Sequence, residues 1–345
     1  MKVCIVTPAP LGTNSGNRVT ALRWRELLCE LGHDAVVVEA YEGRSCDVLV
    51  ALHARRSAPS IARFRSMQPD APLVVALTGT DLYGDLDNSP SARRSVELAS
   101  RIVVLQRLGL EQVPPALRSR VRVIEQSVKP IPPAQPRDDV FEVVLLAHLR
   151  SVKDPFIAAQ AVRDLPEESR IQVVHAGGEI EPGMADRARA ESERNPRYAW
   201  VGELPRGEAL RILARSRLLV LTSRLEGGAN VVSEALAASV PVVSTRISGS
   251  IGLLGEDYPG YFPVGDPRAL RHLLSRIERD GAFRTTLRTW VEGLRWLVDP
   301  ARERERWGSL LTEITDAGLS FHPRTRPGGH DSGTSPQATG GWDSK

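Results

Sequence analysis

The 345-residue sequence has only three cysteines, Cys4, Cys29 and Cys46, and it has no long apolar run. Three cysteines cannot all pair and their spacing fits no zinc motif, which argues against a disulfide scaffold and a structural metal site. No stretch approaches the roughly 18 apolar residues that a membrane span requires. The apolar segment after Met1 is too short for the core of a signal peptide. We therefore expect a reduced, soluble, cytoplasmic protein with no membrane partner.

An excess of one charge is also missing. The chain has 45 Lys and Arg residues against 42 Asp and Glu residues, which gives a net charge of +3. A nucleic-acid surface would show a larger and clustered basic excess, so we expect no nucleic-acid partner. Hydrophobic residues make up 41% of the chain, which is enough to fill the cores of one large or two medium domains.

Short apolar runs alternate with amphipathic stretches along the chain. The runs at 3–7, 35–38, 48–52, 73–77, 102–105 and 121–124 are typical of strands in a parallel sheet covered on both faces. Four prolines then fall within 129–136, which indicates an extended linker. The pattern restarts with apolar runs at 142–147, 171–175, 218–222 and 241–244, and helical patterns separate them.

These patterns predict an α/β protein with two doubly wound, Rossmann-like domains that face each other across a cleft. We expect an N-terminal domain over 1–129, a Pro-rich hinge over 130–137 and a C-terminal domain over 138–298. A last helix over 299–321 can pack back on the first domain, and the Gly-, Ser- and Pro-rich tail over 322–345 should be disordered. Such a pair binds its ligand between the domains, where the strands end.

The most informative segment follows a predicted strand and opens a predicted helix, at 222–237. Gly227 and Gly228 let a ligand approach the backbone, and the free N–H groups at the helix start suit a diphosphate. Glu226 and Glu234 are eight residues apart, about 80° around a helix axis, so both carboxylates can face one cleft. Carboxylates accept hydrogen bonds from sugar and ribose hydroxyls. An isolated Glu-Gly-Gly would favour a plain turn, and the strand–loop–helix context favours the ligand site.

A second segment, at 147–155, follows the first strand of the second domain and contains His148, Arg150 and Lys153. Paired cations at this position can neutralise the charge that develops on a leaving nucleotide diphosphate. A solvated helix start is the alternative interpretation.

Three further loops of the first domain should face the same cleft. The Gly12–Arg18 loop can form an anion-binding nest or a plain turn. His53 and Arg55 follow one strand, and Thr80 and Asp81 follow the next. Arginine suits a phosphate-like anion, with an exposed loop as the alternative. The Asp-x-Asp at 85–87 imitates the metal motif of a different transferase fold, and we expect no metal site there.

Taken together, Glu-x7-Glu at 226–234, the preceding Ser223 and the following 240–244 segment resemble the retaining GT-B-fold glycosyltransferases, over roughly residues 1–315. The resemblance implies a donor-binding second domain, an acceptor-side first domain and no metal or other cofactor. The catalytic residues that it implies are Glu226, Lys153 and Arg150. The donor-binding residues that it implies are Gly227, Gly228, Ala229, Asn230, Glu234, His148, Gly16 and Asn17. The acceptor-binding residues that we expect are Ser15, His53, Arg55, Thr80 and Asp81.

The chain departs from the family pattern at two of these positions. His148 stands where the family has an arginine, and Arg150 follows two residues later. Gly228 stands where most members have an aromatic residue, and we expect it to leave more room near the donor sugar.

The segments at 77–83, 147–155 and 226–234 together are similar to the selenosugar synthases of selenoneine biosynthesis. The resemblance implies transfer of a hexose, GlcNAc or Glc, from a UDP-sugar to selenophosphate. The products would be a 1-seleno-sugar, UDP and phosphate, and other enzymes of that pathway would be partners. Three alternatives stay open: a glycosyltransferase with an oxygen acceptor, a nucleotide-sugar epimerase on the same fold, and a non-catalytic UDP-sugar sensor.

Overall fold

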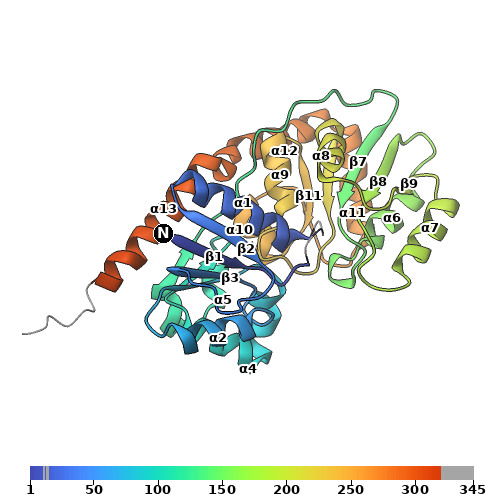
Figure 1. Ribbon diagram of the computed structural model, residues 1–345. Helices are drawn as coiled ribbons and strands as arrows, with labels where there is room; N and C mark the ends of the chain where they lie inside the picture. The colour runs from blue at the N-terminus through green and yellow to red at the C-terminus, as the bar shows by residue number, and fades with distance from the viewer. Residues whose placement is uncertain (11, 13–14, 320–345) are drawn as a thin grey trace, which may run out of the picture.

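The computed structural model describes residues 1–10, 12 and 15–319. These residues form two α/β domains, each built on a six-stranded parallel sheet with helices packed on its faces (Figure 1). The expected fold class is therefore confirmed. The tail that we expect over 322–345 lies outside the described residues.

The first sheet has the strand order β2-β1-β3-β4-β5-β6. Its strands are β1 (Lys2–Val6), β2 (Asp34–Val38), β3 (Val48–Leu52), β4 (Leu73–Leu77), β5 (Arg101–Val104) and β6 (Val121–Val123). Its helical segments are α1 (Gly16–Glu30), α2 (Ala58–Met67), η1 (Asp81–Asp85), α3 (Leu86–Asn88), α4 (Pro90–Leu98), α5 (Gly109–Gln112) and η2 (Pro115–Arg120). The chain changes direction across the sheet between β1 and β3, which places this domain's ligand crevice at the carboxyl ends of those strands.

The second sheet has the order β12-β11-β10-β7-β8-β9, with the change of direction between β7 and β10. Its strands are β7 (Phe141–Leu146), β8 (Ile171–Ala176), β9 (Tyr198–Trp200), β10 (Leu218–Leu221), β11 (Val242–Thr245) and β12 (Tyr261–Phe262). Its helical segments are η3 (Ser151–Lys153), α6 (Phe156–Arg163), α7 (Met184–Arg194), α8 (Arg206–Arg215), α9 (Asn230–Ala238), α10 (Ser248–Leu254), α11 (Pro267–Arg279), α12 (Gly281–Gly293) and η4 (Arg295–Val298). The edge strands β9 and β12, with three and two residues, are too short to show a sequence pattern.

The last helix, α13 (Pro300–Leu319), returns to the first domain and lies beside α1 (Figure 1). Trp307 of α13 and Trp24 of α1 are both fully buried, with ring centroids 4.8 Å apart in an edge-to-face arrangement. The chain thus passes between the domains twice, and the backbone N–H of Val128 donates to the carbonyl of Val298 at 2.9 Å where the two passages meet.

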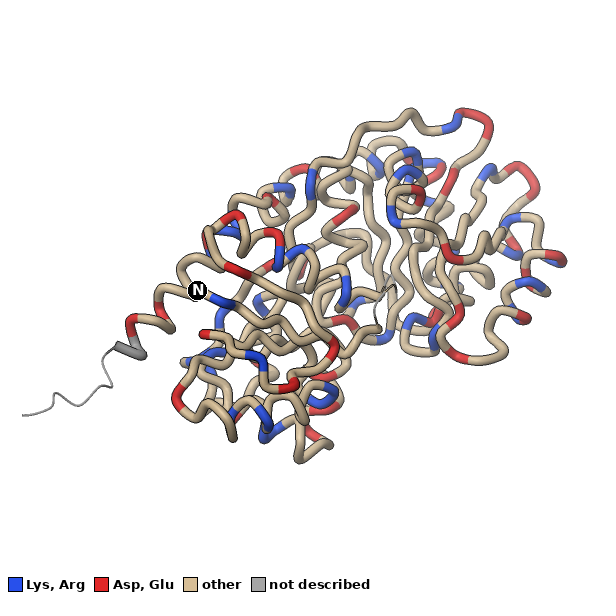
Figure 2. The backbone as a smooth tube through the Cα atoms, in the orientation of Figure 1, with Lys and Arg blue, Asp and Glu red and all other residues tan. Residues whose placement is uncertain are grey.

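Charge is spread over the molecule, with Lys and Arg interspersed among Asp and Glu along both domains (Figure 2). None of the described helices is both long and apolar enough to cross a membrane.

Candidate functional site

The loops after β7 and β10 meet at the point where the second sheet changes direction. The backbone N–H of Arg224 donates to the carbonyl of Val152 at 2.8 Å, and the Thr222 hydroxyl donates to the carbonyl of Lys153 at 2.8 Å. These bonds join the two loops because β7 and β10 are neighbours in the sheet. The two most informative sequence segments therefore lie side by side, in the crevice where open α/β sheets bind their ligands.

Lys153 and Glu226 form an ion pair at the centre of this crevice. The Lys153 ammonium lies 2.5 Å from Oε1 of Glu226, and the Ser223 hydroxyl donates to the same oxygen at 2.6 Å. The Lys153 side chain is 27% exposed, so a ligand in the crevice can reach its charge. Both donors use Oε1, which leaves Oε2 to accept a hydrogen bond from a sugar hydroxyl.

Helix α9 begins directly after the glycines of the Glu226 loop. No side chain accepts from the backbone N–H groups of its first turn within the described part of the chain. The partial positive charge of a helix start therefore faces the crevice beside the Lys153–Glu226 pair. An anion such as a diphosphate would be held by these N–H groups and by the lysine together.

Glu234, one turn inside α9, is buried and paired with Arg206 at the start of α8, with Oε1 and Nη1 2.6 Å apart. Burial raises the pKa of the Glu234 carboxyl, and the guanidinium groups of Arg206 and Arg23 oppose that rise. Arg206 carries no sequence signal, because it is 28 residues away and follows an ordinary proline.

Our expectation that Gly228 leaves more room near the donor sugar is wrong. A Cβ atom at this position would lie 2.6 Å from the Cβ of Leu105 in the first domain, and one at Gly227 would lie 2.6 Å from the backbone of Gly79. The missing side chains therefore do not enlarge the space around a donor sugar. They allow the two domains to approach each other at the site.

Replacing Gly228 by Ala should therefore reduce turnover of the donor by about tenfold or more. Overpacking of about 1–3 kcal/mol would oppose the domain contact, and about 1.4 kcal/mol corresponds to a factor of ten. The matched control is Gly207→Ala, because a Cβ there meets nothing within 4 Å. Steady-state kinetics of both variants, with thermal unfolding as the check of folding, measures the effect. Wild-type kinetics in Gly228→Ala would show that the domains need not touch here.

Two residues expected at the donor site meet across the domain boundary. The Asn230 amide donates to the carbonyl of Gly16 at 3.3 Å, at the start of α1. Ser15 caps that helix by accepting from the N–H of Arg18 at 3.4 Å, and Asn17 lies half-buried in the first turn. The loop residues 13 and 14 lie outside the described residues.

Arg150 and His148 lie on the β8 side of the crevice, away from Glu226. Arg150 faces Glu181, with Nε and Oε1 3.9 Å apart, and Nδ1 of His148 accepts from the N–H of Gly178 at 3.1 Å. The structure therefore brings Lys153, and not Arg150, to Glu226. Arg150 remains a predicted diphosphate ligand whose side chain would have to turn from Glu181.

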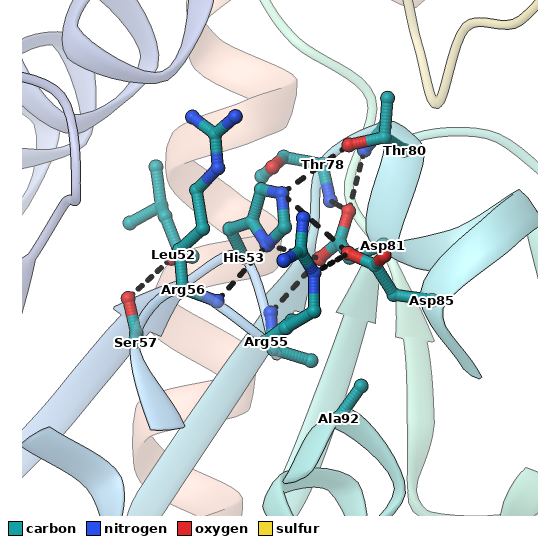
Figure 3. A network of polar contacts seen from close by, with 12 residues as sticks. Leu52, His53, Arg55, Arg56, Ser57, Thr78, Thr80, Asp81, Asp85 and Ala92 are labelled. Atoms are coloured by element: carbon teal, nitrogen blue, oxygen red, sulfur yellow. Dashed lines mark hydrogen bonds and ion pairs between the residues drawn. The ribbon is translucent and has the colours of Figure 1, made fainter. Parts of the chain in front are cut away.

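Four of the five residues expected on the acceptor side, His53, Arg55, Thr80 and Asp81, form one polar network in the first domain (Figure 3). The fifth, Ser15, is not part of it and caps α1. His53 follows β3 with a left-handed backbone, φ 71°, and its side chain is 4% exposed. Its Nδ1 accepts from the N–H of Arg56 at 3.4 Å, so we assign the proton to Nε2, which lies 3.3 Å from the Thr80 hydroxyl. Burial lowers the pKa of His53, which favours the neutral imidazole.

Asp81 is fully buried and its two oxygens are occupied by backbone donors. Oδ1 accepts from the N–H groups of Thr78 and Gly79 at 3.1 and 2.8 Å, and Oδ2 accepts from the N–H of Ala54 at 3.0 Å. The prediction that Asp81 contacts the acceptor directly is therefore wrong, because its buried carboxylate accepts backbone hydrogen bonds that join the two loops.

Arg55 is half exposed and forms an ion pair with Asp85 at 2.8 Å, which also lies 3.9 Å from Nε2 of His53 (Figure 3). The sequence gives no sign of this partnership. Within the described residues, no group of three or more His, Cys, Asp or Glu side chains is placed to hold a metal ion.

A cleft of about 310 Å³ opens beside Glu226 at the domain boundary, lined by Tyr83 of the first domain and by Arg224, Arg246 and Ser248 of the second. Gln106 donates to the Tyr83 hydroxyl at 2.8 Å, and burial raises the pKa of Tyr83 to about 12. A space of this size next to the carboxylate can receive a small substrate.

His175 supports the β7 end of the site from inside the sheet. Its Nε2 donates to the carbonyl of Ala147 at 2.8 Å, and its Nδ1 therefore accepts from the Tyr198 hydroxyl at 2.6 Å. Burial lowers the pKa of His175 from 6.5 to about 4, so the folded state binds its proton later than the unfolded state as pH falls.

This histidine should make folding sensitive to acid. Its contribution is full above pH 6.5 and is lost as the pH falls towards 4, by about 3 kcal/mol at 1.36 kcal/mol per pKa unit. Urea unfolding at pH 7.5 and 4.5 should show a larger loss in the wild type than in His175→Gln. Equal losses in both proteins would contradict this account.

Residues 130–291 match the family model described as glycosyl transferases group 1. The chain is 23% identical over 280 residues to glycosyltransferase 1 domain-containing protein 1 from Xenopus tropicalis, covering 73% of this chain and 81% of that protein.

Two solved structures share the fold. HepE from Anabaena, in complex with UDP, superposes with a TM-score of 0.71 at 15% identity, covering 91% of this chain and 100% of that one. Sucrose-phosphate synthase from Thermosynechococcus elongatus gives a TM-score of 0.69 at 16% identity, covering 92% and 99%. The fold is therefore that of the GT-B proteins.

Proposed function

We propose that this chain is a glycosyltransferase, as the match of residues 130–291 to the group 1 family model suggests, and that it transfers a hexose from a UDP-sugar to selenophosphate. The observation that carries the donor half is the Lys153–Glu226 pair beside the start of α9, at the point where the second sheet changes direction. HepE, which shares the fold, has been crystallised with UDP, with UDP and glucose and with UDP-glucose.

The donor half of the mechanism follows from charge and position. The UDP leaving group gains negative charge as the bond from its phosphate oxygen to C1 of the hexose breaks. The Lys153 ammonium and the free N–H groups of α9 lie where they can stabilise that charge. Oε2 of Glu226 would hold a hexose hydroxyl, and Glu234 would hold the ribose hydroxyls. Contact between the domains would align the two substrates and keep bulk water away from C1 during the transfer step, before hydrolysis of the P–Se bond.

The acceptor half rests on the likeness of three segments to the selenosugar synthases, together with the polar network around His53. A lone pair of selenium forms the new bond to C1 while the electron pair of the C1–O bond leaves with UDP. Water then cleaves the P–Se bond: its hydroxyl joins phosphorus to give phosphate, and its remaining proton balances the selenolate of the 1-seleno-sugar. Selenium is a strong nucleophile as an anion, so the transfer step needs no general base.

The acceptor residues would act by orientation. Arg55 presents a half-exposed guanidinium that can grip two phosphate oxygens, and Nε2 of His53 and the Thr80 hydroxyl lie beside it. Asp81 would contribute indirectly, because it fixes the loops that carry these groups.

A hydroxyl acceptor is the second candidate, because the Anabaena relative binds glucose together with UDP. One assay separates the candidates: purified protein with UDP-GlcNAc or UDP-glucose, with and without selenophosphate made in situ. We expect UDP release that depends on selenophosphate, and a product with the isotope pattern of one selenium atom in its mass spectrum. UDP release with sugars or alcohols alone would move the assignment to an oxygen acceptor. UDP-sugar binding without turnover would indicate a sensor.

A further inference from the structure

Arg23, on α1 of the first domain, reaches across the domain boundary to α9. Its Nη1 donates to Oδ1 of Asn230 at 3.2 Å, and its side chain is only 13% exposed. The other side of the Asn230 amide donates to Gly16 and, at 3.5 Å, to the hydroxyl of Thr20. The side chain of the first residue of α9 is therefore held by groups of the other domain.

Glu303 of α13 holds Arg23 in this position. The Arg23 Nε donates to Oε2 of Glu303 at 3.1 Å. Glu303 is buried and also accepts from the Trp24 indole at 2.7 Å and from the backbone and hydroxyl of Ser127 at 2.7 and 2.5 Å. These donors come from the first domain and its exit segment, so Glu303 holds the guanidinium through contacts that do not involve α9.

Arg23 also acts on Glu234. Asn230 and Glu234 are four residues apart on α9 and so share one face of the helix. Arg206 of α8 is paired with Glu234 at 2.6 Å, and the charges of Arg206 and of Arg23 both lower the pKa that burial raises. Nη2 of Arg23 is buried and has no hydrogen-bond partner among the described residues.

We propose that Arg23 is a positioning residue through which domain contact completes the donor site: held by Glu303, it fixes Asn230 at the start of α9, one turn before the buried Glu234 that would hold the ribose of the donor. The proposal rests on the proposed function, because the ribose is itself a proposed ligand of Glu234. It gives the C-terminal helix a part in donor binding, although α13 lies on the far side of α1.

The test uses Arg23→Gln, which keeps an amide donor at this position but carries no charge. UDP affinity, measured by calorimetry, should fall by about tenfold, and Arg23→Lys should restore part of it. The acid limb of the pH profile of kcat/KM should move to a higher pH in Arg23→Gln, because loss of a nearby cation raises the pKa of Glu234. A merely structural role of Arg23 would not move that limb.

The matched control is Arg25→Ala, an exposed arginine on the same helix, which should bind UDP as the wild type does. Thermal unfolding checks that each variant folds. Arg23→Gln could be unstable because Glu303 loses its counter-charge. In that case the double variant Arg23→Gln/Glu303→Gln removes both charges and should show the same loss of UDP affinity.

The proposal would be overturned if the folded Arg23→Gln protein, or the double variant, bound UDP with wild-type affinity and kept the wild-type acid limb of kcat/KM. An equal loss in Arg25→Ala would overturn it as well. A wild-type protein that does not bind UDP at all would instead contradict the proposed function, and the inference would fail with it. The two failures are therefore distinguishable by the wild-type titration.

Discussion

Lys153→Met should lower kcat for UDP-sugar turnover by about 100- to 1,000-fold, the usual cost of one preorganised group that stabilises developing charge. The methionine keeps the length and burial of the lysine stem but removes the ammonium that lies 2.5 Å from Glu226. The departing diphosphate would then depend on the N–H groups of α9 alone. Initial rates of UDP release, measured at saturating donor, give the effect.

The control is Lys129→Met in the linker, where the lysine is 74% exposed and paired with Glu26. This variant should keep wild-type rates, because an exposed ion pair far from the crevice contributes little. A Lys153→Met protein with full activity would remove the ammonium from the mechanism. A protein that has lost only its affinity for the donor, with kcat unchanged, would assign Lys153 to ground-state binding.

Glu303→Ala should lower the free energy of unfolding by about 3–5 kcal/mol, the range found when one partner of a buried ion pair is removed. The change leaves Arg23, Trp24 and Ser127 without their shared acceptor in a buried place. Because α13 supplies Trp307 to the core of the first domain, its attachment should weaken as well.

Urea unfolding of Glu303→Ala beside Glu305→Ala measures this effect, since Glu305 is an exposed residue of the same helix. The control should change the free energy of unfolding by less than about 0.5 kcal/mol, as for an ordinary surface position. Similar values for the two variants would show that α13 is held by its apolar face and not by the buried carboxylate.

The fold could be predicted from the sequence because each central strand is a continuous apolar run, buried on both faces. The runs at 48–52 and 73–77 coincide with β3 and β4, whose residues are all buried. The edge strands β9 and β12 could not be predicted, because two or three residues carry no periodicity.

The donor loops could be predicted because their residue types stand close together in the sequence. Glu226, Gly227 and Gly228 follow one strand, and Lys153 follows the neighbouring one. The contact of Arg23 with Asn230 and Glu303 could not be predicted. Arg23 and Glu303 are separated by 280 residues and meet only because α13 returns to the first domain. The sequence-based prediction for Gly228 is wrong for the same reason, since its neighbour Leu105 belongs to the other domain.

The residues expected on the acceptor side show a different limit of prediction from sequence. His53 and Asp81 are both polar residues after a strand, and the sequence offers no way to tell their roles apart. The structure distinguishes the contacts of the two side chains: Asp81 accepts from three backbone donors, whereas Nε2 of His53 faces the Thr80 hydroxyl. From sequence alone, a buried carboxylate that accepts hydrogen bonds from loop N–H groups cannot be told apart from one that binds a ligand.

The central claim concerns the donor site at the meeting point of β7, β10 and α9, and a crystal structure with UDP tests it most directly. We predict the diphosphate between the Lys153 ammonium and the first-turn N–H groups of α9, with the ribose hydroxyls on Glu234. UDP bound elsewhere, or bound at the crevice with Lys153 still paired to Glu226 and Glu234 out of reach of the ribose, would contradict the account.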